Sequence, residues 1–327
     1  MVTWPAGATV RPLEQKDAEA AVELANAIAA ADGSGQYVTL EDYSDALAMP
    51  DFSADSDSLG VWSSGRLVGY GLVPGPDVLK ELSILQHKGG VHPDHRRQGF
   101  GGPLLDWLTE RAGVRSREEH PGLTTAIDVD VEDTNLGALA LLAGRGYEPI
   151  RYYSTMQRPY AAEVVAAAPA SDQFRVIPFD PAYDESLRLA YNEIFADHWG
   201  SVPKDPDHWR TWFTGHRAFR PALSYLVLED ERIAAFTLAY EFLVDTEKTG
   251  VRELWAGQVG TRREYRGRGL ARAALTAVLR GGDAAGFERA GLAVDADSPT
   301  GAFRLYEKLG YRAVTTRIQH RLTQPPP

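Results

Sequence analysis

Two short stretches rich in glycine and arginine carry the residues best suited to bind a ligand. The later one, at residues 266–271, follows an apolar run over residues 254–259 and precedes apolar residues at helical spacing. A helix that begins there exposes backbone N–H groups without intrahelical partners, and these groups and the helix dipole attract anions. Glycine lets a phosphate approach the backbone where a Cβ would block it. The pattern therefore predicts a pyrophosphate-binding turn between a strand and a helix.

The earlier stretch, at residues 96–101, repeats this pattern. Its Arg96 and the later Arg266 are 170 positions apart. Each copy is followed by a glycine–tyrosine pair, and Tyr147 and Tyr311 of these pairs are 164 positions apart. Two motifs that recur in the same order at nearly one offset indicate an internal duplication.

The motif Arg/Gln-x-x-Gly-x-Gly/Ala after a strand resembles the signature of the GCN5-related N-acetyltransferase (GNAT) superfamily. The resemblance implies that each loop binds the pyrophosphate of acetyl-CoA, or of another acyl-CoA. The residues of the later loop and of the strand before it are Val259, Gly260, Thr261, Arg266, Gly267, Arg268, Gly269, Leu270 and Ala271. Those of the earlier loop are Val91, Arg96, Arg97, Gln98, Gly99, Phe100 and Gly101.

The order of predicted elements in each half is strand, two helices, hairpin, strand, helix, strand, helix, strand. This order matches the α/β fold (α+β with a mixed sheet) that the resemblance implies, in two tandem GNAT acyl-CoA N-acyltransferase domains. The predicted ranges are residues 1–158 for the N-terminal domain, 159–173 for an alanine-rich linker, 174–323 for the C-terminal domain and 324–327 for a tail.

Composition narrows the class of protein. With 327 residues, 44% hydrophobic and 24% charged, the chain resembles a globular protein with about two domains. The absence of cysteine excludes disulfides, thiolate metal sites and cysteine nucleophiles, and we predict no metal site. The net charge of −11 argues against nucleic acid or an anionic membrane as the partner. Neither a signal peptide nor a membrane-spanning run is recognisable, which predicts a cytoplasmic protein, either monomer or homodimer.

Transfer of an acyl group from a thioester to an amine requires a deprotonated amine, donors for the oxyanion and a proton for the departing thiolate. In the superfamily, backbone amides of the strand before the loop serve as the donors, which here implies residues 259–261. A tyrosine on the last helix often lies near the coenzyme sulfur, and Tyr306 matches it. The first half has Leu142 at that place, which cannot donate a proton. The C-terminal domain is therefore the predicted catalytic one, and the N-terminal domain is predicted to be degenerate.

The sequence offers two candidates for the general base. Carboxylates on the strand that leads to the loop are frequent bases in related enzymes, and Glu253 lies on that strand, thirteen positions before Arg266. The position at the same offset in the first half is Ser83. Glu241 on the preceding hairpin is an alternative to Glu253. Either carboxylate also fits a solvated strand end.

A third candidate region follows the first helix of the second half. In the superfamily this segment borders the acceptor pocket, and here it contains Asp197, His198 and Trp199. Asp197 is suited to hold an ammonium, His198 to act as a base and Trp199 to form a wall. The same residues also fit a helix end capped by polar side chains.

These observations favour an acetyl-CoA-dependent N-acetyltransferase that acts on a primary amine of a small molecule. The tandem arrangement also resembles superfamily members that acetylate a cysteinyl amine in thiol biosynthesis, and an antibiotic-modifying or self-resistance acetyltransferase is equally open. The alternative from another class is a non-catalytic acyl-CoA-binding protein. The fold and the cofactor motifs do not define the acceptor.

Overall fold

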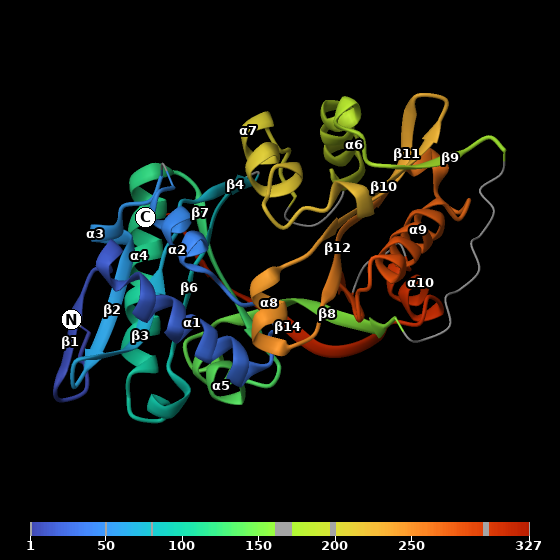
Figure 1. Ribbon diagram of the computed structural model, residues 1–327. Helices are drawn as coiled ribbons and strands as arrows, with labels where there is room; N and C mark the ends of the chain where they lie inside the picture. Colours follow the sequence, from blue (N-terminus) through green and yellow to red (C-terminus); the bar gives the residue numbers. More distant parts are fainter. Residues whose placement is uncertain are drawn as a thin grey trace. The chain divides into compact units, whose positions relative to one another are not determined.

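The computed structural model describes residues 2–49, 51–79, 81–160, 172–196, 201–296 and 301–326. The chain divides into two compact units (Figure 1). Unit 1 is Met1–Tyr153 together with Thr315–Pro327, and unit 2 is Ser154–Val314. Both units combine helices with strands, which confirms the predicted fold class.

Unit 1 contains two groups of paired strands. The first is antiparallel in the order β1 (Ala8–Arg11), β2 (Ser58–Ser63), β3 (Arg66–Leu72) and β6 (Lys88–Val91). The second has the order β4 (Asp77–Leu79), β5 (Leu82–Gln86), β7 (Thr124–Glu132) and β14 (Arg312–Gln324). β5 and β7 are parallel, whereas β7 and β14 are antiparallel. The last strand of the chain thus pairs inside unit 1.

The described helices of unit 1 are α1 (Ala18–Asp32), α2 (Leu40–Leu47), α3 (Ala54–Asp57), α4 (Gly101–Glu119) and α5 (Leu136–Ala143). α4 packs on β5 and β7, and its Leu104 and Leu108 share a buried cluster with Leu85 and Ile127. α1 packs on β3, where its Leu24 contacts a second cluster.

Unit 2 has one run of neighbouring strands. Their order is β8 (Glu148–Pro159), β13 (Arg289–Asp295), β12 (Glu253–Thr261), β11 (Arg232–Tyr240), β10 (Tyr225–Glu229) and β9 (Arg175–Pro178). β12 and β13 are parallel, and β9 to β12 pair antiparallel. Only the part of β8 from Ser154 onward belongs to this unit.

The described helices of unit 2 are α6 (Asp184–Phe195), α7 (Pro206–Trp209), α8 (Leu243–Thr249), α9 (Leu270–Ala284) and α10 (Ala302–Lys308), and a π-helical turn spans Arg210–Thr214. Buried clusters cover the two sides of the strands, and each side is named here after the helix that packs on it. The α9 face contains Leu254, Leu275 and Leu292. The α6 face contains Leu187 and Leu238, among others.

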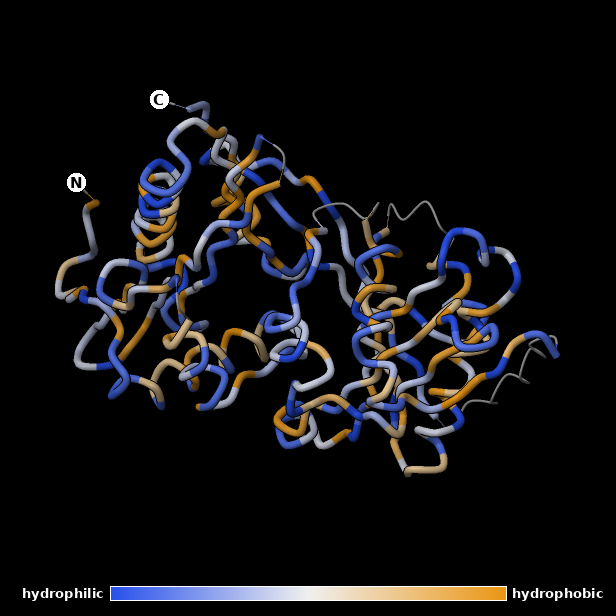
Figure 2. Tube along the Cα trace, turned by 90° about the horizontal axis from the view of Figure 1, so that it is seen from above, coloured by the Kyte–Doolittle hydropathy of each residue, from blue (hydrophilic) through white to orange (hydrophobic). Residues whose placement is uncertain are grey.

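Hydrophobic and hydrophilic stretches alternate along the chain in both units (Figure 2), and the hydrophobic ones supply the buried clusters. Burial of these apolar side chains removes them from water, which is the main favourable contribution to folding. No helix among the described residues is both long and apolar enough to cross a membrane.

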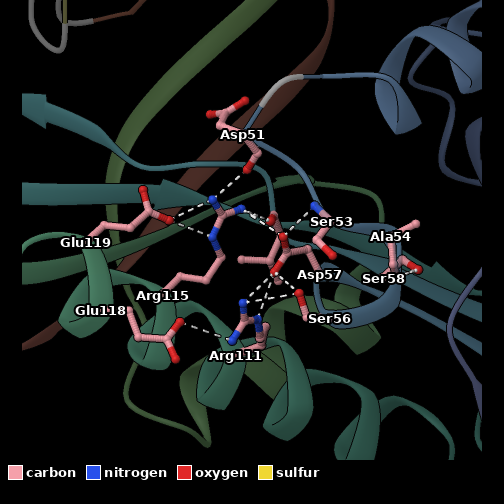
Figure 3. Close-up of polar contacts among 11 residues, drawn as sticks. Asp51, Ser53, Ala54, Ser56, Asp57, Ser58, Arg111, Arg115, Glu118 and Glu119 are labelled. Atoms are coloured by element: carbon pink, nitrogen blue, oxygen red, sulfur yellow. Dashed lines mark hydrogen bonds and ion pairs between the residues drawn. The ribbon is translucent and has the colours of Figure 1, made fainter.

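A buried ion cluster ties three segments of unit 1 together (Figure 3). Oδ1 of Asp57 accepts a hydrogen bond from Nε of Arg111 at 2.8 Å, and its Oδ2 accepts one from Nη1 of Arg115 at 3.2 Å. Arg115 also donates to the backbone oxygens of Val73 and Asp51, at 3.0 and 2.6 Å. Loss of one partner would leave a buried charge uncompensated, so the cluster holds the start of β2 firmly on α4.

The compact units differ from the predicted domain ranges at the closing strands. The predicted ranges assign residues 315–323 to the C-terminal domain, whereas this segment belongs to unit 1. Conversely, residues 154–158 belong to unit 2. A strand at the end of a repeat has the same residue pattern whichever sheet it joins, so the sequence pattern does not reveal the exchange.

Candidate active site

The later glycine-rich loop of unit 2 connects β12 to α9. β12 ends at Thr261, a 3₁₀ turn covers Arg263–Tyr265, and α9 begins at Leu270. Gly267 and Gly269 both have φ of 78°, a left-handed conformation that favours glycine. No heavy atom lies within 4 Å of the position that a Cβ would take at either glycine, so the backbone there faces open space.

The amides of this loop are available to a ligand. Among the described residues, no hydrogen bond is donated by the backbone N–H groups of residues 267–272, and the first bonded one is Ala273, which donates to the oxygen of Gly269 at 3.0 Å. Arg266 and Arg268 are exposed, and neither has an ion pair among the described residues. Arg266 Nε donates to the oxygen of Thr261 at 3.3 Å. Free amides, a helix dipole and two arginines together form a site for a dianion such as a pyrophosphate.

An opening in the sheet lies next to this loop. The pairing of β12 with β13 covers only Glu253–Trp255 of β12, although β12 continues beside β11 to Thr261. The remaining residues of β13 therefore separate from β12. Since the amide of Arg262 donates to Ala234 on β11, the alternation of an antiparallel ladder turns the N–H groups of Val259 and Thr261 toward the opening.

A β-bulge interrupts β12 beside this opening. The register with β11 passes from Gln258 directly to Ala256, so Gly257 is the extra residue. Gly257 is exposed, although it lies in the middle of a strand with neighbours on both sides. The bulge bends β12, and among the described strands its backbone groups are unpaired at the point where β13 separates from β12.

Tyr306 lies on α10 at the α9 face. It is 6% exposed and shares a cluster with Ala256, Leu292 and Val294, which flank the opening. Its ring lies 6.2 Å from that of Tyr311 in an edge-to-face arrangement. Burial raises the pKa of Tyr306 to about 12, so the hydroxyl is protonated at neutral pH and available as a donor.

Glu253 lies at the other end of β12, where β12 and β13 are still paired. It accepts hydrogen bonds from Arg289 and, at 3.1 Å, from Nε2 of Gln157. Burial raises its pKa, and the neighbouring Arg289 opposes this rise. It lies four positions before Gly257 along the strand, or roughly 13 Å at 3.3 Å per residue. A proton would thus reach Glu253 through intervening groups such as water.

Glu241 is enclosed by two guanidinium groups. It is buried, and it accepts hydrogen bonds from Arg252 at 2.7 Å and from Arg220 at 2.8 Å. Burial alone would raise its pKa, but the bonds from Arg252 and Arg220 outweigh that effect and lower it. This environment favours a structural ion pair over a free base.

The other predicted acceptor residues, Asp197, His198 and Trp199, lie outside the described residues. In the described ranges no group of three or more histidine or carboxylate side chains is placed to hold a metal ion.

The earlier loop has the same backbone form in unit 1. Arg97 and Gly99 have φ of 62° and 88°, and α4 follows from Gly101. Arg96 Nε donates to the oxygen of Val91 at 3.3 Å, as Arg266 does to Thr261. In contrast to Arg266, Arg96 is paired with Asp32, whose Oδ1 accepts from its Nη1 at 2.8 Å.

The strands before the two loops differ by one residue. Leu254 and Leu85 both bury on the helix-covered face beside the parallel partner strand, and they are 169 rather than 170 positions apart. Among the described residues of unit 1, the pairing of β3 with β6 shows no bulge like that at Gly257. Ser83 consequently faces α4, where it bonds to His120, whereas Glu253 lies on the opposite side of its strand. Ser83 has the same offset from its loop as Glu253 but is not its structural counterpart.

The motif search missed Tyr240 and Gln258, which adjoin the bulge on the α6 face. The hydroxyl of Tyr240 donates to Oε1 of Gln258 at 2.8 Å. A glycine inside a strand is a signal for a bulge, so Gly257 pointed to this position. The sequence offered no sign of the tyrosine that contacts it.

Comparison with known proteins defines the class. The model of the acetyltransferase (GNAT) family matches residues 25–147 and again residues 185–311. The chain belongs to this family, with two tandem copies of the domain, and its activity is that of an acyl-CoA-dependent N-acetyltransferase.

Two relatives and two solved structures show how far this similarity extends along the chain. A mycothiol acetyltransferase of Kineococcus radiotolerans is 32% identical over 327 residues and covers 97% of each chain. One of Catenulispora acidiphila is 32% identical over 241 residues, which is 71% of this chain and 70% of the relative. A crystal structure of a GCN5-related N-acetyltransferase from Sphaerobacter thermophilus has a TM-score of 0.77 at 25% identity and covers 98% of this chain and 97% of that one. A tandem GNAT protein from the clavulanic acid biosynthesis pathway shares the fold, with a TM-score of 0.68 at 17% identity over 97% of this chain and 98% of that one.

Proposed function

We propose that unit 2 transfers the acetyl group of acetyl-CoA to a primary amine of a small molecule by direct attack on the thioester. The observation that carries this proposal is the junction of β12 and α9, where unbonded amides at a helix start adjoin an opening between two parallel strands. The pyrophosphate would lie on residues 266–271, with Arg266 and Arg268 nearest its charge. The acyl end of the same molecule would extend into the opening.

The chemistry follows from the groups around that opening. The amine nitrogen forms a bond to the carbonyl carbon, and the N–H groups of Val259 and Thr261 stabilise the negative charge that develops on the oxygen. The carbon–sulfur bond then breaks, and the Tyr306 hydroxyl gives its proton to the departing thiolate. The proton that the amine loses passes to Glu253 through water.

A cysteinyl amine is the particular acceptor that we propose. The support is the likeness to mycothiol acetyltransferases, one of which aligns over nearly the whole of both chains. Acetylation of an antibiotic, as modification or self-resistance, uses the same chemistry on another amine. A non-catalytic acyl-CoA-binding protein would not need Tyr306 beside the opening.

Unit 1 retains a complete phosphate loop but has Leu142 in place of the tyrosine. We propose that it binds acyl-CoA without turnover. Calorimetry on a variant with a disrupted unit 2 loop tests this, since loss of all coenzyme binding would contradict it. A cytoplasmic location and a monomeric or homodimeric state stay predictions from the sequence.

Release of free CoA thiol in the presence of acetyl-CoA and a panel of amines tests the function. The panel contains aminoacyl amides, amino sugars and polyamines, and the acetylated product is identified by mass spectrometry. We expect amine-dependent release, which would be absent if the chain were only a binding protein.

A further inference from the structure

The α6 face of β12 presents a short row of side chains beside the bulge. Cross-strand partners in an antiparallel pair share a face. Trp255 pairs with Tyr240, and Gln258 pairs with Leu238, which belongs to the cluster of the α6 face. Trp255 and Gln258 therefore flank Gly257 on one side of the sheet, opposite to Tyr306 and α9.

Tyr240 is held rigidly against the bulge. It is 4% exposed, and a Cβ at Gly257 would lie 2.7 Å from its ring, so only glycine permits this contact. The rings of Phe219 and His216 pack around it, with centroids at 5.6 and 6.4 Å. Burial raises the pKa of Tyr240, which keeps its hydroxyl protonated.

The bond from Tyr240 orients the amide of Gln258. The tyrosine hydroxyl donates to Oε1 of Gln258 at 2.8 Å, which turns the NH₂ group of the amide the other way. That Nε2 donates no hydrogen bond to any described residue, and it is absent from the buried atoms that lack a partner. The side chain is half-buried. Two N–H donors are thus accessible at a fixed orientation, one residue from the Val259 amide that faces the opening.

A neutral ligand oxygen suits the amide donors of Gln258. The arginines at the start of β12 and β13 already have carboxylate partners, because Arg289 bonds to Glu253 and Arg252 to Glu241. An incoming carboxylate would find no uncommitted cation among these groups. A carbonyl oxygen requires only the amide donors of Gln258.

We propose that Gln258 determines acceptor specificity by donating a hydrogen bond to a carbonyl oxygen on the carbon next to the reacting amine. Tyr240 is the positioning residue for this contact. The substrate class is then the aminoacyl amides, of which a cysteinyl amide is one. This inference rests on the proposed function of unit 2 and narrows its acceptor.

The matched probes are L-serinamide and ethanolamine, which differ by the carboxamide group and contain no thiol to disturb the assay. The ratio of their kcat/KM values is measured for the wild type, Gln258→Leu and Tyr240→Phe at one pH. Comparison of ratios cancels the different basicity of the two amines. Gln86→Leu, which removes a glutamine from a strand of unit 1, is the control.

We expect the wild type to prefer L-serinamide and Gln258→Leu to lower that preference about tenfold, the effect of one lost hydrogen bond. The change should fall on L-serinamide and leave ethanolamine nearly unaffected. Tyr240→Phe keeps the ring on Gly257 and should lower the preference several-fold, and Gln86→Leu should not change it. L-serine, with a carboxylate in place of the amide, should be a poorer substrate than L-serinamide.

The outcomes separate this inference from the proposed function. If no amine of the panel is acetylated by the wild type, the function itself is wrong. If amines are acetylated but neither probe is accepted, or if Gln258→Leu leaves the preference unchanged, the acceptor class is wrong and the function stands. Thermal melting of each variant identifies any that fail to fold, in which case Gln258→Glu, which keeps the length of the side chain but removes the donors, replaces Gln258→Leu.

Discussion

The strands that lead to the two glycine-rich loops lie among matching elements in both units, but the side chains around them differ. In unit 2 the α9 face has Ala256 on the strand and Tyr306 on the last helix, both in one cluster. In unit 1, His87 takes the place of Ala256 and Leu142 takes the place of Tyr306. The aromatic side chain therefore comes from the strand in unit 1 and from the helix in unit 2. The imidazole of His87 lies 6.2 Å from the Tyr147 ring, centroid to centroid. The side chains at these two positions thus differ between the units, and the hydroxyl of Tyr306 has no equivalent at Leu142.

The opposite faces of these strands differ as well. Where unit 2 has the small residues Gly291 and Ala293 on β13, unit 1 has Asp128 and Asp130 on β7. Asp128 accepts two hydrogen bonds from Arg321 of β14, at 2.6 and 2.7 Å. In unit 2 the side chains of Trp255 and Glu253 lie over Gly291, whereas in unit 1 the ion pair of Asp128 and Arg321 occupies the matching face. The two units thus share the loop but differ in the side chains around the strands that lead to it.

The strongest test of this comparison is the phenol of Tyr306. Tyr306→Phe should lower kcat by about 100-fold or more while KM for acetyl-CoA changes little, because the hydroxyl acts on the leaving thiolate and not on binding. Steady-state kinetics with the best amine of the panel measures this. Activity that survives undiminished would remove Tyr306 as the acid. Leu142→Phe, at the matching place in unit 1, is the control and should leave kcat unchanged.

The second test blocks one of the two glycine-rich loops at a time. Gly269→Val places a branched side chain at a left-handed φ in the path of the phosphate, so kcat/KM for acetyl-CoA should fall about 100-fold. Gly99→Val makes the same change in unit 1, and turnover should remain. Equal losses in both variants would mean that unit 1 takes part in catalysis.

A third, smaller effect should distinguish the role of Arg266 from that of Arg96. Arg266→Ala should raise KM for acetyl-CoA about tenfold, since one charge-assisted hydrogen bond to phosphate is lost. Arg96→Ala should instead lower the stability of the fold by about 1 kcal/mol, because Arg96 is paired with Asp32. Kinetics and chemical denaturation on both variants are needed. A KM effect from Arg96→Ala would show that turnover depends on the first loop.

The last test concerns the stability of unit 1 against pH and has no expected effect on activity. Burial lowers the pKa of His87 to about 4 from its ordinary 6.5. The unfolded chain therefore binds the proton first, and the stabilisation that is complete above pH 6.5 is lost as the pH falls toward 4. His87→Phe should abolish roughly 3 kcal/mol of this loss. The control is internal: His92 and His320, whose pKa values are also lowered, remain in both proteins. Denaturant unfolding at pH 7 and pH 4.5 gives the difference, and equal losses in the two proteins would contradict the assignment.

Much of the fold and part of the site could be predicted from local patterns. The loops at residues 96–101 and 266–271 were recognisable because glycine and arginine at a helix start have a local physical meaning. The helices over residues 18–32 and 270–284 follow from apolar spacing. The environment of Glu241 was not predictable, because Arg220 and Arg252 reach it from other segments. The offset from the loop could not show which way Ser83 faces, because one inserted residue turns every earlier side chain of a strand to the other face.

By itself the sequence determined that the domain is duplicated, that each copy has a strand, a glycine-rich loop and a helix in that order, and that only the second copy has a tyrosine on its last helix. These properties depend on neighbours within a few positions along the chain. The tertiary structure alone decided which strand completes each unit, that Gly257 bulges and that Tyr240 orients Gln258. Such contacts join residues far apart in the sequence, and their geometry exists only once the strands have paired.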